Sequence, residues 1–248
     1  MPSAVPVQPI PVTTPTPTGG GTSPGGVTGG TRGTSGPDSL RGTAGANLIF
    51  GLGGPDSILG LGADDSLYGG DGDDSLLGDA GNDLLFGGAG RDSVLGGAGD
   101  DTSYGGKGSD SMLGDDGNDL LFGNQDTDTL LGGAGDDSLF GGAGDDSLFG
   151  GIGNDCLSGD RGNDTLTGGA GNDTFAIGRL ADGDVITDFT DGTDRIRLTA
   201  GLTFGELTIA AGAGTSPSTI IQLTSTKETL ATLFGVARAS ISQADFIL

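Results

Sequence analysis

The stretch Gly132-Gly133-Ala134-Gly135-Asp136-Asp137-Ser138-Leu139-Phe140 is one copy of a nine-residue unit that decides the fold. Sixteen copies follow one another without a break over residues 33–176. Position one is Gly in all sixteen copies, position four is Gly in fourteen, position six is Asp in fifteen, and position eight is apolar in fifteen. Asn47 and Ser103 are the departures at positions six and eight. A period this short indicates a solenoid, in which each unit stacks on its neighbours.

The positions of the unit predict a turn followed by a strand. Glycine reaches positive φ and allows backbones to approach closely, so positions one to four predict a tight turn. Positions seven to nine predict a three-residue strand whose position-eight side chain points inward, because strand side chains alternate. Two units then close one coil, and the coils stack with parallel strands about 4.8 Å apart. We therefore expect an all-β fold, a right-handed parallel β-roll with two nonapeptides per coil, eight coils and a small β-rich C-terminal cap.

The acidic residues make this roll difficult to fold unaided. The chain has a net charge of −24, and residues 33–176 contain 26 Asp against four cations. Stacked coils bring aspartates that are eighteen residues apart into neighbouring turns, where bare carboxylates repel. The core is one residue wide per half-coil, while ordering the backbone costs about 1–2 kcal/mol per residue. A cation between the carboxylates is therefore expected.

Calcium fits the donor set best. Ca²⁺ takes six to eight oxygens, from carboxylates and backbone carbonyls, and Gly-rich turns leave carbonyls accessible. Zinc is disfavoured because the chain has no His and Cys156 is its single Cys. Magnesium prefers octahedral sites that retain water. Without calcium we expect disorder, which the composition alone would favour, because metal binding and folding are coupled.

The segment 33–176 resembles the parallel β-roll of RTX, or hemolysin-type, calcium-binding proteins. This resemblance implies that each ion lies between one turn and the next turn on the same edge of the roll. The position-six aspartates of both turns and carbonyls of the Gly-rich positions would hold it, so Asp74 and Asp92 would share one ion, and Asp83 and Asp101 another. The metal-ligand candidates are Asp65, Asp74, Asp83, Asp92, Asp101, Asp110, Asp119, Asp128, Asp137, Asp146, Asp155, Asp164 and Asp173.

The first copies of the repeat depart from this pattern and are expected to bind more weakly. Pro37 and Pro55 occupy position five, Thr or Leu replaces the second Gly, and Asn47 lacks the charge. Asp126 stands at position four, where Gly is usual, and is expected to strain its turn.

Position nine carries a second period of eighteen residues. The aromatic members are Phe50, Tyr68, Phe86, Tyr104, Phe122 and Phe140, and Leu59, Leu77, Leu95, Leu113 and Leu131 alternate with them. One sheet should therefore present an outward aromatic column and the other a leucine column. Stacking of like residues would stabilise the strands. Alternatively, the aromatic column is a contact surface for self-association or for a neighbouring domain.

The flanks differ from the repeat. Residues 1–32 are rich in Pro, Thr and Gly, which predicts a disordered linker without the features of a Sec signal peptide. Residues 177–248 predict a cap with short strands at 184–189, 195–198, 207–209, 219–223 and 229–236. The ending Asp245-Phe246-Ile247-Leu248 resembles the C-terminal signal of type I secretion substrates, or is a final edge strand. No stretch is long enough for a membrane span.

These features favour a secreted calcium-binding protein that folds in extracellular calcium after export by type I secretion machinery. We do not expect an enzyme, because there is no His and the paired aspartates share one environment, whereas a catalytic pair needs carboxylates that differ. The acidity disfavours nucleic acid and anionic membranes as partners. Two alternatives remain open: a structural or adhesive surface component, and the C-terminal secretion and folding module of a larger RTX enzyme or toxin.

Overall fold

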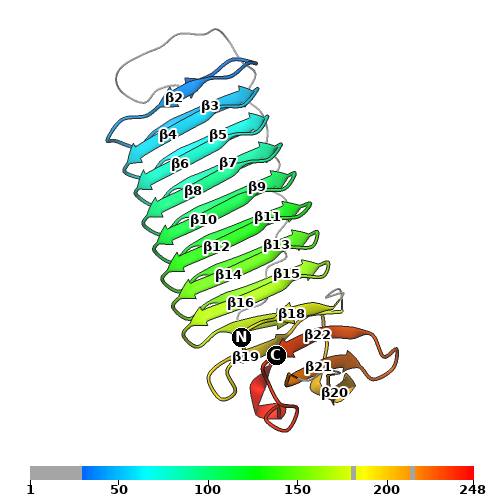
Figure 1. The fold of residues 1–248 in the computed structure, drawn as a ribbon. Helices are drawn as coiled ribbons and strands as arrows, with labels where there is room; N and C mark the ends of the chain where they lie inside the picture. Colours follow the sequence, from blue (N-terminus) through cyan, green and yellow to red (C-terminus); the bar gives the residue numbers. More distant parts are fainter. Residues whose placement is uncertain (1–29, 180–182, 213–215) are drawn as a thin grey trace.

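The chain forms a long parallel β-solenoid with a smaller C-terminal cap (Figure 1). The computed structural model describes residues 30–179, 183–212 and 216–248. Two sheets lie against each other, and the chain alternates between them. Sheet A contains, in order, β1 (Thr31–Arg32), β3 (Leu48–Gly53), β5 (Ser66–Asp71), β7 (Leu84–Ala89), β9 (Thr102–Lys107), β11 (Leu120–Gln125), β13 (Ser138–Ala143), β15 (Cys156–Arg161), β17 (Thr174–Ile177), β19 (Arg195–Leu198) and β23 (Phe246–Ile247).

Sheet B takes the intervening strands and ends in the cap. Its order is β2 (Ser39–Arg41), β4 (Ser57–Gly62), β6 (Ser75–Ala80), β8 (Ser93–Ala98), β10 (Ser111–Asp116), β12 (Thr129–Ala134), β14 (Ser147–Ile152), β16 (Thr165–Ala170), β18 (Asp184–Ile186), β22 (Thr229–Phe234), β21 (Ser218–Leu223) and β20 (Leu207–Ala211). Within the repeat, each residue pairs in parallel with the residue eighteen positions later, as Leu67 does with Leu85. The coil of two nonapeptides is thereby confirmed.

The strands are twice as long as the sequence predicted. Each complete strand covers positions seven to nine of one copy and one to three of the next, so only positions four to six form the turn. The expectation of a turn over positions one to four was therefore wrong at positions one to three. The position-one glycine is needed for another reason: a Cβ on Gly141 would collide with the carboxylate of Asp146. Positive φ occurs instead at positions two and four, as at Gly142 (φ 110°) and Gly144 (φ 147°).

The core is a double column of position-eight side chains. From Ile49 to Phe175, the apolar members are at most 1 % exposed. Ser103 interrupts the column: its side chain is 2 % exposed, and its hydroxyl has no hydrogen-bond partner. It lies between Leu85 and Leu121 on neighbouring strands of sheet A.

The two sheets continue beyond the last nonapeptide. β18 and β22 extend sheet B, while β19 and β23 extend sheet A. The antiparallel strands β20, β21 and β22 form the cap expected in this region, together with the 3₁₀ turns η1 (Phe204–Glu206) and η2 (Gln243–Asp245). The C-terminal residues form a parallel edge strand, β23, on β19. Most of the linker predicted for residues 1–32 lies outside the described residues, and Thr31 and Arg32 form β1.

The aromatic column is present on the outer face of sheet A. Consecutive rings from Phe50 to Phe140 stack with centroids 4.8–5.0 Å apart and nearly parallel planes. The guanidinium of Arg32 lies 4.9 Å from the centroid of the Phe50 ring at the first end of the column. Stacking with this regularity contributes to the pairing of the sheet A strands.

Replacing Ser103 by Ala should stabilise the folded protein by about 1 kcal/mol, because it removes a buried hydroxyl that no group satisfies. The measurement is the urea midpoint of the calcium-loaded protein. Ser66→Ala, at an outward position of the same sheet, is the control and should leave the midpoint unchanged. Destabilisation of Ser103→Ala would show that the hydroxyl is satisfied in solution.

Candidate calcium sites

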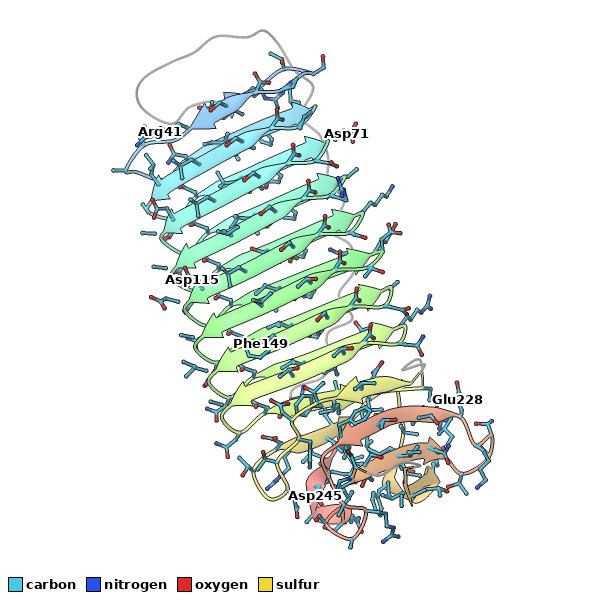
Figure 2. All side chains as sticks on the ribbon, in the orientation of Figure 1. Arg41, Asp71, Asp115, Phe149, Glu228 and Asp245 are labelled. Carbon is cyan, nitrogen blue, oxygen red and sulfur yellow. The ribbon has the colours of Figure 1, made fainter. Side chains whose placement is uncertain are left out.

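Position-six aspartates form a column along each of the two edges where the chain turns between the sheets. We call the edge formed by the turns that follow the sheet A strands edge A, and the edge formed by the turns that follow the sheet B strands edge B. In Figure 2, Asp71 at the end of β5 marks the side of edge A, and Asp115 in β10 marks the side of edge B. The structure places all thirteen candidates in these columns at 0–3 % exposure. Edge A holds Asp74, Asp92, Asp110, Asp128, Asp146 and Asp164, and edge B holds Asp65, Asp83, Asp101, Asp119, Asp137, Asp155 and Asp173.

One carboxylate oxygen of each candidate is used by the neighbouring coil. The backbone N–H of Asp74 donates to Asp92 Oδ1 at 2.8 Å, and the N–H of Asp119 donates to Asp137 Oδ1 at 2.8 Å. The same bond recurs at every step of both columns. The residue pairs that the resemblance assigned to shared ions are thus direct neighbours.

The second oxygen is buried without a partner. Oδ2 has no hydrogen-bond donor in fourteen of the buried aspartates of the described residues, including twelve of the thirteen candidates; Asp173 is the exception. A Cβ on Gly132 would lie against both Asp137 Oδ2 and the carbonyl oxygen of Gly150 in the next coil. Both oxygens therefore approach Gly132 from the same side, and a buried carboxylate oxygen without a donor is an environment that a nearby cation would stabilise.

Burial raises the pKa of these carboxyls above the ordinary aspartate value. Desolvation is the main cause, the backbone hydrogen bond opposes it, and for most of these groups the charge of aspartates in adjoining coils adds to it. The pKa rises to about 7 for Asp101, Asp128 and Asp137. It rises to about 6 for Asp74, Asp83, Asp92, Asp110, Asp119, Asp146 and Asp155.

Backbone oxygens would have to complete any metal site. In the part of the chain that the structure describes, no three Asp, Glu, His or Cys side chains converge as a closed ligand set. The position-six carboxylates supply too few oxygens for the six to eight that Ca²⁺ requires. The donor set, carboxylates alternating with Gly-rich backbone, fits a hard oxygen-seeking cation, with the position-six aspartates as its proposed side-chain ligands.

The first turns and Asp126 deviate in structure as well as in sequence. Asn47 is half-buried and donates from its amide to Asp65 Oδ1, and Asp38 Oδ2 accepts bonds from the backbone N–H and the hydroxyl of Thr34 in its own turn. Asp126 has a φ of 72°, a strained value for a residue with a side chain, and Asp126 Oδ2 accepts a bond from the N–H of Gly108.

Two aspartates that sequence reasoning missed, and a third that it placed among the weaker first copies, belong to the same columns. Asp56 is 3 % exposed with an unpaired Oδ2, although its turn contains Pro55. Asp184 and Asp194 extend the columns past the repeat, accepting from the N–H groups of Asp164 and Asp173. The signal of Asp184 and Asp194 was an Asp followed two residues later by Ile, which repeats positions six and eight without the glycines of positions one and two.

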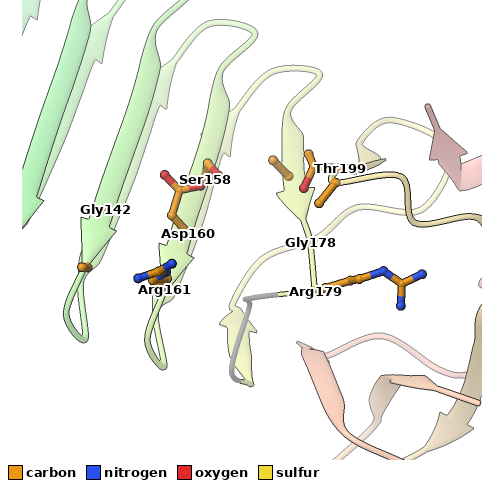
Figure 3. A pocket seen from close by; sticks show the side chains of 10 residues that line it. Gly142, Ser158, Asp160, Arg161, Gly178, Arg179 and Thr199 are labelled. Atoms are coloured by element: carbon orange, nitrogen blue, oxygen red, sulfur yellow. Dashed lines mark hydrogen bonds between the residues drawn. The ribbon is translucent and has the colours of Figure 1, made fainter. Parts of the chain in front are cut away.

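A shallow depression lies on sheet A beyond the last aromatic ring (Figure 3). It is floored by small residues of β13, β15 and β17, and the Ser158 hydroxyl donates to Asp160 at 2.8 Å. Arg179, at its margin, pairs with Glu206 of η1. The depression holds one carboxyl, Asp160, and none of the unpaired Oδ2 atoms described above.

The fold and the turn columns define a β-roll whose repeated Gly-Asp turns suit cations. A family model for the RTX calcium-binding nonapeptide repeat, four copies long, matches residues 32–67, 59–94, 95–130, 122–157 and 149–182. The chain therefore belongs to the RTX calcium-binding nonapeptide repeat family, and it is a calcium-binding repeat protein.

Two solved structures resemble the chain. One is the AlgE6R3 subunit of the Azotobacter vinelandii mannuronan C5-epimerase, at 30 % identity over 50 % of this chain and 80 % of the subunit, with a TM-score of 0.42. The other is the extracellular lipase LipA of Serratia marcescens, at 19 % identity over 87 % of this chain but 40 % of the lipase, with a TM-score of 0.34. A comparison with curated proteins gave no significant match. None of the described helices has the length and apolar character to cross a bilayer.

The raised pKa values predict an unusual pH dependence without metal. Because the folded-state pKa of these carboxyls lies above the ordinary value of 3.8, the folded chain binds more protons than the unfolded chain between about pH 4 and 7. The stability of the metal-free roll should therefore fall as pH rises through this window. Circular dichroism of calcium-stripped protein should show β structure at pH 5 that is lost by pH 7.5. Equal β content at both values would contradict the buried, proton-sensitive columns.

Proposed function

We propose that this protein couples its folding to calcium through the two columns of position-six aspartates. The observation that carries the proposal is the row of buried, unpaired Oδ2 atoms along both edges. Without a cation at neutral pH, each carboxylate is desolvated beside others of like charge. A cation bound to the folded roll, and not to the unfolded chain, stabilises the fold by mass action.

A calcium titration followed by far-UV circular dichroism at pH 7.5 tests this proposal. We expect a coil-to-β transition with calcium, reversed by chelator, and no transition with the same concentration of magnesium. Asp119→Asn with Asp137→Asn should raise the calcium midpoint, because two adjacent ligands lose their charge. Asp191→Asn, an exposed acidic residue outside the position-six columns, is the matched control and should behave like the unmodified chain. A chain already folded in chelator at pH 7.5 would exclude the proposed coupling.

We further propose that the chain acts outside the cell, after export in an unfolded state by type I secretion. Low cytosolic calcium would leave the columns unfilled, and extracellular millimolar calcium would fill even weak sites. The single Cys makes an intramolecular disulfide impossible, so calcium would take the stabilising role that disulfides have in many secreted proteins. Ile247 and Leu248, at the end of the signal-like segment, are 37 % and 88 % exposed.

We propose a binding and structural role, not catalysis. The position-six carboxylates repeat one environment along each edge, and their pKa values rise together, whereas acid–base catalysis uses carboxyls whose pKa values are driven apart. As an alternative, the roll serves as the secretion and folding module of a larger enzyme or toxin. The chain matches 40 % of the length of the lipase named above, which is the relation expected of such a module. A structural or adhesive surface component is the other alternative.

The aromatic column offers a surface for self-association, which is the observation behind the structural alternative. The rings from Phe50 to Phe140 form an uncharged strip on sheet A, while the Asp columns lie at the edges. If two rolls associate through it, Phe86→Ser with Phe122→Ser should convert the calcium-loaded protein to monomer in analytical ultracentrifugation. Leu77→Ser with Leu113→Ser, on the opposite face, is the control. A calcium-loaded wild type that is already monomeric would exclude self-association.

A further inference from the structure

The two edges of the roll are built from the same repeat but differ at position five. On edge B this position is Asp or Asn in seven successive coils and alternates between the two over the first six, whereas on edge A it has no regular pattern. The edge B residues are Asp64, Asn82, Asp100, Asn118, Asp136, Asn154 and Asn172. The edge A residues in the same coils are Asp73, Arg91, Ser109, Thr127, Asp145 and Asn163.

The alternation on edge B forms an unbroken hydrogen-bond ladder. The side-chain oxygen of each member accepts from the backbone N–H of the next member at 2.7–3.1 Å, for example from the N–H of Asn118 to Asp100 Oδ1 at 2.8 Å. The side-chain amides of Asn118 and Asn154 donate to the preceding aspartates as well. On edge A, position five makes only two such links in residues 33–176, from Arg91 to Asp73 and from Asn163 to Asp145.

This ladder runs opposite to the bonds of position six. At position six, each side chain accepts from the preceding coil, and at position five from the following coil. Successive turns of edge B are therefore joined by two bonds of opposite direction, whereas most turns of edge A have only the position-six bond. A site whose turns are already ordered before the ion binds has a higher affinity, because less conformational entropy is lost on binding. Edge B is therefore the more preorganised of the two edges.

Charge favours the same edge. The aspartates of residues 33–176 divide equally between the edges, but Arg91, Lys107 and Arg161, the cations of positions two to six in this segment, are all on edge A. Arg91 Nη2 lies 3.3 Å from Asp73 Oδ2, and the charge of Asp73 acts on the neighbouring Asp92. Arg91 therefore offsets part of the negative potential that would attract an ion to the Asp74–Asp92 turn pair. In the described turns, edge B has no such cation.

We propose that the roll carries two classes of calcium site, one along each edge, and that edge B fills at lower calcium concentration than edge A. This inference rests on the proposed function, since it assumes that the position-six columns bind calcium. It assigns position five, which the resemblance left without a role, to setting the affinity of the adjacent ions.

The primary test compares matched position-six variants by isothermal titration calorimetry with calcium at pH 7.5. Wild type should show two binding phases. Asp101→Asn with Asp119→Asn, on edge B, should raise the dissociation constant of the tighter phase by about tenfold or more, because two consecutive turns each lose a carboxylate ligand. Asp92→Asn with Asp110→Asn, on edge A, should leave the tighter phase in place and reduce the weaker one. A single phase, or equal effects of the two pairs, would overturn the two-class proposal.

A second pair of variants leaves every position-six aspartate intact, so it still reports if the first set folds poorly. Asn118→Ala with Asn154→Ala breaks the edge B ladder and should weaken the tighter phase. Ser109→Ala with Thr127→Ala, at the same position on edge A, should not. Arg91→Gln should strengthen the weaker phase.

If wild type takes up no calcium at all, the proposed function itself fails; if calcium binds and these variants match wild type, only the edge assignment fails.

Discussion

Everything in this molecule depends on the burial of one carboxylate per half-coil. Because each nonapeptide stacks on an almost identical one, any residue at a fixed position becomes a column, and position six becomes a column of negative charge on each edge. Oδ1 of each buried member is satisfied by a backbone N–H of the adjacent coil, whereas Oδ2 has no donor in fourteen of them. A column of this kind is costly at neutral pH unless protons or metal ions neutralise it. The stability of the roll is thus a property of its solvent conditions as much as of its side-chain packing.

The same constraint explains why the repeat contains so much glycine. The position-six carboxylate folds back over position one, where a Cβ would collide with it, so position one is glycine in every copy. Positions two and four have positive φ in most copies, and the eight residues with a side chain that adopt it there, such as Leu61 at φ 96° and Asp126 at φ 72°, are strained. Glycine loses more backbone entropy on folding than any other residue. We therefore expect a chain that needs this much glycine and has a core one residue wide to depend on ion binding more than a globular domain does.

The period of the sequence allowed most of the architecture to be predicted. The spacing of Leu67, Leu85 and their equivalents gave the coil, the parallel pairing and the inner column, and the aromatic residues at position nine gave the ring stack. Strand length was not predictable in this way, because a run of glycines indicates a turn unless one knows that a carboxylate covers it. Asp184 and Asp194 were missed because the glycines of positions one and two are absent there, although the sheets and the Asp columns continue.

The repeat unit of the structure is larger than the repeat unit of the sequence. Position five on edge B alternates between Asp and Asn, and position seven of sheet A alternates between Leu and Ser or Thr over Leu48, Ser66, Leu84, Thr102, Leu120 and Ser138. These two positions therefore repeat every second coil, that is, every 36 residues, while the core repeats every coil. In a solenoid each coil contacts only its neighbours, so stability is close to a sum of nearest-neighbour contributions. Alternation places a neutral Asn between two position-five aspartates. The charged carboxylates are then two coils apart, which weakens their repulsion, while every backbone hydrogen bond of the ladder is kept. Position five can thus hold the turns in register without adding a second continuous column of charge to the one at position six.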